Sequence, residues 1–143
     1  MKRLAAVMVA ASLSLFGCSG VSGDEADTEK WTAVLVDALE TVDNVEEMAD
    51  VRYSPQGVFT TDQVWLNGKL MVNSDDTAVV QKVLDDAGRA IAEAFAENTV
   101  EKSWVRISAI TASNKRVNIQ DVIGEDNTVT LDTLAEHYGI PRR

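Results

Sequence analysis

Two alternating stretches that flank one long amphipathic stretch constrain the fold of this chain more than any other feature. Apolar residues recur at every second position from Val64 to Val72 and again from Trp104 to Thr111, which predicts two strands, with Gly68 at a candidate bulge. Between them, residues 75–97 carry apolar side chains at intervals of three and four, the pattern of a helix. A helix that connects two strands packs on their sheet, so we expect a sheet with helices on one face.

Shorter patterns extend this unit at both ends. Residues 30–43 predict an amphipathic helix, residues 45–53 a strand, and residues 116–120 a short strand. A last helix begins near Thr130 and stops at Gly139-Ile140-Pro141, an order typical of a helix C-terminus. The predicted order is α-β-β-α-β-β-α, an α+β fold with a small antiparallel or mixed sheet and helices packed on one face. This layout resembles the α+β sandwiches related to the ferredoxin-like fold, which hosts many functions.

The first residues have the pattern of an export signal. Lys2 and Arg3 precede an uncharged run from Leu4 to Phe16. This run is shorter than the roughly 20 apolar residues that cross a bilayer, but it has the length of the apolar part of a secretory signal. Directly after it lies Cys18, the single cysteine of the chain. The sequence therefore predicts that the protein leaves the cytoplasm.

The residues Leu15-Phe16-Gly17-Cys18 resemble the lipobox of bacterial lipoproteins, which has an aliphatic residue, two usually small residues and an obligatory cysteine. Phe16 is bulkier than the residue usual at its position. The resemblance implies that Leu15, Phe16 and Gly17 guide a signal peptidase, and that Cys18 receives a diacylglyceryl group and becomes the mature N-terminus. It also implies a location on the extracytoplasmic face of the cell membrane. The alternative is an ordinary signal peptide cut nearby, for instance after Gly20, which would discard Cys18.

These patterns divide the chain into three parts. Residues 1–17 form the predicted signal peptide, residues 18–29 the lipidated cysteine and a flexible acidic tether, and residues 30–143 a single α+β domain. Removal of residues 1–17 leaves 11 Lys and Arg against 23 Asp and Glu, a net charge of −12. Because anionic lipid repels such a domain, we expect the lipid on Cys18, and not a basic patch, to hold it at the membrane. The same charge argues against nucleic acid as a partner.

Residues that carry chemistry are sparse. One cysteine and one histidine, His137, supply too few ligands for a transition-metal site, and the acidic clusters lack the spacing of a calcium loop. No serine lies in a G-x-S-x-G motif, and no glycine-rich nucleotide-binding motif is present. We therefore expect no catalytic residues, no metal, and no cofactor beyond the covalent lipid.

Large side chains on the second face of the predicted strands form a candidate binding surface. If the alternating aliphatic residues face the helices, then Trp65, Met71, Trp104 and Ile110 face away from them. Exposed, they would suit an envelope protein, a wall polymer or an apolar ligand. The interpretation that we prefer from sequence is that the last helix or a loop covers this face, which would make these residues a second small core.

Taken together, the sequence predicts a lipid-anchored, extracytoplasmic lipoprotein of the cell envelope. Its domain is expected to be a non-catalytic binding or interaction domain, and the specific activity is not identified by any motif. One alternative is an assembly module that self-associates through the face carrying Trp65 and Trp104. A less favoured alternative is an envelope enzyme of unrecognised type.

Overall fold

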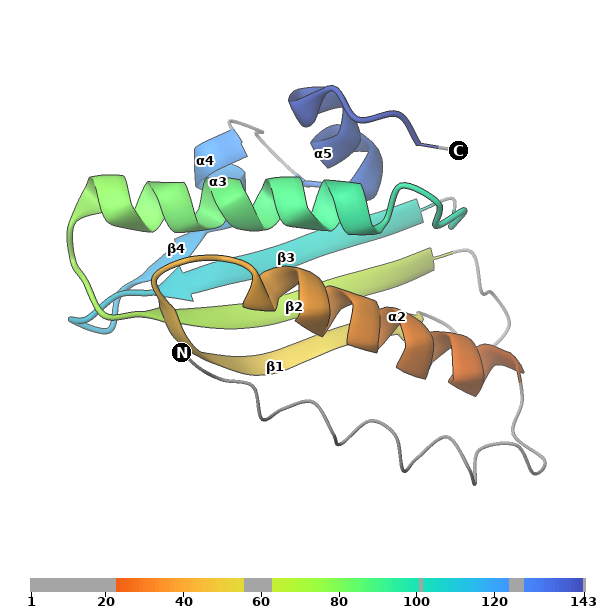
Figure 1. Ribbon diagram of the computed structural model, residues 1–143, viewed down its shortest axis with the longest axis horizontal. Coiled ribbons are helices and arrows are strands. Elements are labelled where there is room, and N and C mark those ends of the chain that lie inside the picture. Colours follow the sequence, from red (N-terminus) through yellow and green to blue (C-terminus); the bar gives the residue numbers. More distant parts are fainter. Residues whose placement is uncertain (1–22, 56–62, 101, 124–127, 143) are drawn as a thin grey trace.

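A four-stranded mixed sheet lies at the centre of the fold (Figure 1). The computed structural model describes residues 23–55, 63–100, 102–123 and 128–142, with side chains from Asp27 onward. The strands β1 (Val45–Pro55), β2 (Gln63–Val72), β3 (Lys102–Ile110) and β4 (Arg116–Asn118) are neighbours in that order. β1–β2 and β3–β4 pair antiparallel, and β2–β3 pair parallel.

The helices lie together on one side of this sheet (Figure 1). They are α2 (Gly23–Glu40), α3 (Thr77–Ala94), α4 (Ile119–Ile123) and α5 (Leu131–Tyr138). α3 connects the parallel strands β2 and β3, and α2 and α5 both pack against it. The α+β class and the predicted α-β-β-α-β-β-α order are confirmed. Among these helices, none is both long enough and apolar enough to cross a membrane.

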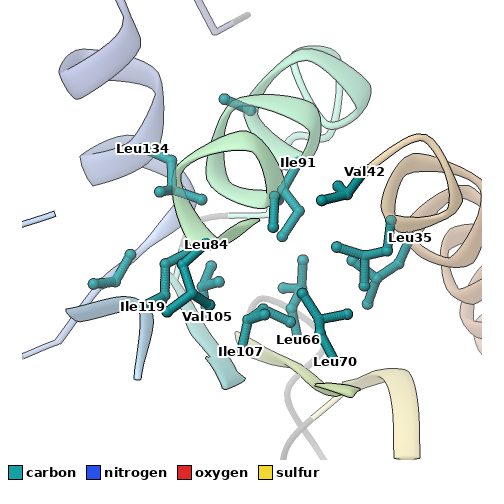
Figure 2. Packing of buried hydrophobic residues seen from close by; sticks show 14 of the residues in the cluster. Leu35, Val42, Leu66, Leu70, Leu84, Ile91, Val105, Ile107, Ile119 and Leu134 are labelled. Atoms are coloured by element: carbon teal, nitrogen blue, oxygen red, sulfur yellow. The ribbon is translucent and has the colours of Figure 1, made fainter. Parts of the chain in front are cut away.

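One core fills the space between the helices and the sheet. In Figure 2, Leu35 of α2 and Ile91 of α3 point toward Leu66 and Ile107 of the central strands, and Leu134 of α5 points toward α3. All five side chains are fully buried. The stripe of α3 and the alternation of β2, in which every second residue is buried, are as the sequence predicts. Burial of a Leu or Ile side chain contributes about 1.5–3 kcal/mol, so this layer carries most of the stability.

The bounds of two elements differ from the prediction. α2 begins at Gly23, so residues 23–29, which the sequence assigns to a flexible tether, are helical. The first turns of a helix favour acidic residues and need no apolar stripe where they project beyond the core, as the exposed Asp27 and Glu29 show. Residues 18–22 of the predicted tether lie outside the described residues. The strand predicted at residues 116–120 ends at Asn118, because α4 begins at the next residue.

The irregularity predicted at Gly68 lies on the neighbouring strand. The β2–β3 register is continuous, whereas the β1–β2 register shifts between Ala49 and Arg52. Asp50, within the shift, has a φ of 57° in the left-handed region. Gly68 lies opposite, where a Cβ atom would be 3.2 Å from Cδ1 of Ile107. Glycine at this position therefore allows close packing beneath α2 and is not itself the bulge.

The last helix, α5, is held against α3 by one tyrosine. The Tyr138 hydroxyl donates to the Asp85 carbonyl oxygen at 2.8 Å and lies 2.7 Å from Asp85 Oδ1. Burial, together with Asp85, raises the pKa of Tyr138, so the hydroxyl keeps its proton and remains a donor. A Cβ atom on Gly88 would come within 2.9 Å of this hydroxyl. Because α5 belongs to the helical layer, the interpretation that it covers the second face of the sheet is wrong.

The contact between Gly88 and Tyr138 predicts the effect of Gly88→Ala. The added methyl group must displace the hydroxyl, and such overpacking costs about 1–3 kcal/mol. Since alanine gains about 1 kcal/mol of helix propensity, we expect a net loss of about 1 kcal/mol. Urea denaturation of Gly88→Ala, Tyr138→Phe and the double variant measures this, and the loss should shrink when the hydroxyl is absent. An equal loss in both backgrounds would show that the hydroxyl is not the obstacle.

Candidate binding surface

The four large residues singled out from the sequence lie on the sheet face opposite the helices. Trp65 pairs with Trp104 and Met71 with Ile110 across the parallel strands β2 and β3. All four side chains are partly exposed, and the described part of the chain places no helix or strand over this face, which we call the open face. The two pairs are six residues apart along each strand, or about 20 Å. They are therefore two separate apolar spots and not one patch.

The tryptophan pair forms a stack with an arginine. The rings of Trp65 and Trp104 have centroids 5.5 Å apart and planes inclined by 30°. The guanidinium carbon of Arg106 lies 4.4 Å from the ring centroid of Trp65, within the range of a cation–π interaction. Trp31, by contrast, packs on the helix side, with its ring centroid 5.0 Å from that of Phe95. One end of the open face thus carries a partly exposed aromatic and cationic cluster.

Polar side chains fill the open face between the two apolar spots. Lys69 lies opposite Ser108 in the register, and its Nζ is 3.2 Å from Asp50 Oδ2. The Ser108 hydroxyl donates to Asn118 Oδ1 at 2.8 Å. The surface sinks here into a hollow of about 290 Å³, which we call the basic hollow. Its polar lining comprises Asp50, Asn67, Lys69, Arg106, Ser108, Arg116, Asn118 and Gln120.

A second hollow, of about 240 Å³, adjoins the tryptophan pair. It is lined by Trp65 and Trp104 together with Arg106, Gln120 and Thr128, and we call it the aromatic hollow. Arg106 and Gln120 line both hollows, so the two lie side by side. The open face can therefore contact a polar group and a ring at the same time.

Charge is distributed unevenly over this acidic protein. Five of the ten lysines and arginines in the described residues occupy open-face positions: Arg52, Lys69, Lys102, Arg106 and Arg116. Asp50 is the one acidic residue among those that line the basic hollow. The net charge of −10 conceals this basic face, because an overall charge carries no information on position. The strand alternation could have revealed it, since Lys69 and Arg106 share the phase of Trp65 and Trp104.

The remaining candidates from the sequence add no further site. Leu15, Phe16, Gly17 and Cys18 lie outside the described residues. His137 is exposed at the end of α5, where its ring lies 4.7 Å from that of Tyr138. Within the described ranges, no group of three or more His, Cys, Asp or Glu residues is placed to hold a metal ion. Comparisons of the chain with protein-family models, with curated proteins and with solved structures found no match.

Truncation of the tryptophan pair distinguishes a surface from a core. Leu66 is adjacent to Trp65 but fully buried on the helix side, so Leu66→Ala should lower the free energy of unfolding by about 2–5 kcal/mol. The double variant Trp65→Ala and Trp104→Ala should cost less than this single change, because both rings already contact solvent. Chemical denaturation followed by circular dichroism measures both. A larger loss for the tryptophan variant would mean that the pair is the centre of a second core.

Proposed function

We propose that this protein is a lipid-anchored, extracytoplasmic lipoprotein whose domain binds a partner through the open face without catalysing a reaction. The observation that carries the binding role is the partly exposed stack of Trp65, Trp104 and Arg106 on a sheet face that no described helix or strand covers. The anchoring role is supported by the sequence Leu15-Phe16-Gly17-Cys18 after a short apolar run.

The stack has the composition of a binding surface. Tryptophan and arginine are the side chains that most often dominate interface energies, and each aromatic side chain can bury about 150–250 Å². The part of the two indole rings that remains in contact with water contributes no hydrophobic stabilisation to the fold. A partner that covers them would recover that free energy at about 25 cal/mol per Å² of apolar surface. The aromatic hollow beside the rings offers the concave shape that such contact needs.

A non-catalytic role is supported by what lines the open face. The polar side chains that line the basic hollow are three cations, three amides, the Ser108 hydroxyl and the Asp50 carboxylate, with no histidine or cysteine among them. The Ser108 hydroxyl donates to Asn118, and Asp50, the one carboxylate among the lining residues, is paired with Lys69. These groups suit the binding and orientation of a ligand more than the transfer of protons.

Replacement of Cys18 tests the anchor. The change Cys18→Ser removes the thiol that would accept the diacylglyceryl group, so we expect the protein to leave the membrane fraction or to accumulate as an uncut precursor. Two acyl chains give stable anchoring where one does not, which makes the expected shift nearly complete. The matched control is Ser19→Ala, which should stay in the membrane. Membrane fractionation and labelling with radioactive palmitate measure both. Unchanged retention and processing of Cys18→Ser would contradict the anchor.

Site-specific photo-crosslinking in cells tests the binding face. A photo-crosslinking residue in place of Lys102, exposed on the open face two residues before Trp104, should form an adduct with the partner. The same residue in place of Glu93, exposed on α3 in the helical layer, should form none. Mass spectrometry identifies the adducts, and an adduct with a second copy of this chain would favour the self-associating alternative. Adducts from position 93 alone would contradict the choice of face.

A further inference from the structure

The arginines of the open face have no carboxylate partner among the described residues. Among all the described residues, three ion pairs are formed, and none of them includes Arg106 or Arg116. They join Lys69 to Asp50, Lys82 to Asp86 and Arg142 to Asp132. Both arginines are exposed and line the basic hollow. In a chain with 23 acidic residues, two arginines that converge on one hollow without such a partner leave their charge available to an anion from outside.

We propose that the open face binds a small phosphate ester, with the phosphate in the basic hollow and the attached ring against Trp65 and Trp104. The inference rests on the proposed function, because it names the ligand class of the same face. It uses a property that the tryptophan pair alone does not have, namely that Arg106 lines both hollows.

The charge of the basic hollow matches a phosphate monoester. Lys69, Arg106 and Arg116 contribute three positive charges, and Asp50 removes one. A phosphate monoester carries about −1.5 to −2 near neutral pH, so it would nearly neutralise the remainder, whereas a carboxylate would leave one positive charge in excess. A guanidinium group can donate two parallel hydrogen bonds to two oxygens of one phosphate. The side-chain amides of Asn67 and Asn118 supply further donors. The hollow, at about 290 Å³, has room for such a group.

The position of Arg106 would place the phosphate of the ligand next to the indole rings, within reach of a ring attached to that phosphate. Its guanidinium lies over Trp65 and lines both hollows, so a phosphate that it contacts lies beside the indole rings. A sugar or another ring one bond away from the phosphate would then reach the aromatic hollow, where apolar faces stack on indole. The stack of Trp104, Trp65 and Arg106 holds the guanidinium in place, which lowers the entropy lost on binding.

The overall charge favours a small ligand over a polymer or a bilayer. At physiological ionic strength the field of a charge decays over about 8 Å, so a small anion in the hollow responds mainly to the cations around it. An extended polyanion or an anionic membrane would also meet the acidic remainder of the molecule, whose net charge is −10. We therefore expect a soluble ligand and not a lipid headgroup.

Nuclear magnetic resonance of the purified full chain tests the proposal with glucose 1-phosphate, glucose and inorganic phosphate as probes. The three tryptophans give three indole N–H signals, which Trp65→Phe and Trp104→Phe assign. Glucose 1-phosphate should shift the signals of Trp65 and Trp104 but not that of Trp31, which lies on the helix side. It should bind more tightly than either glucose or inorganic phosphate, and added salt should weaken it.

Two charge-matched variants make the test specific. Arg116→Gln, in the basic hollow, should weaken glucose 1-phosphate about tenfold, which corresponds to about 1.4 kcal/mol. Lys115→Gln removes the same charge from the adjacent exposed residue, which does not line this hollow, and should change the affinity less than twofold. Equal losses would overturn the proposal, as would the absence of any shift of Trp65 and Trp104. Binding to vesicles of phosphatidic acid without binding to glucose 1-phosphate would also overturn it.

The outcome separates this inference from the proposed function. If glucose 1-phosphate fails to bind while position 102 still forms adducts in cells, the ligand class is wrong and the binding face stands. If position 102 forms no adduct and the probe also fails, both are wrong.

Discussion

The parallel pairing of β2 with β3 is the constraint on which the rest of the structure depends. Two parallel neighbours must be joined by a crossover, and α3 makes that crossover over one face of the sheet. Its buried stripe then covers the aliphatic side of both strands, and α2 and α5 fill the space on either side of it. β1 and β4 pair antiparallel at the two edges and need no further helix. Every described helix consequently lies in one layer.

A single helical layer has a direct consequence for the chemistry of the molecule. Side chains of one strand phase form the core, and those of the other phase face outward, free to be polar, aromatic or charged. Here that outward phase gathers Trp65 and Trp104 at one end, Lys69 and Arg106 along the middle, and Arg116 beside Ile110. The molecule is acidic as a whole and basic on one face. Because charges are screened over short distances, a small ligand bound there interacts mainly with the local positive charge.

The start of α2 relates the proposed anchor to the open face. Thr32 of α2 accepts a hydrogen bond at 3.1 Å from the backbone of Tyr53, which pairs with Leu66 beside Trp65. The helix therefore enters the fold at the tryptophan end of the sheet. The chain from Cys18 to Gly23 can span about 18 Å at most, and the helix from Gly23 to Thr32 adds about 14 Å. With Cys18 lipidated as we propose, the tryptophan end lies within about 32 Å of the membrane.

The sequence alone determined which residues form the core between the helices and the sheet, and which class of fold results. Periodicities of 3.6 and 2 are local properties, so the stripe of α3, the alternation of β2 and β3, and the end of α5 at Gly139 could be predicted from neighbouring residues. Only the tertiary structure decided the strand order, the parallel register and the place of α5 against Gly88, because these depend on contacts between distant residues. For the same reason the sequence suggested the tryptophans as a surface but did not join them to Arg106 and Arg116, which share the open face only once β2, β3 and β4 are paired.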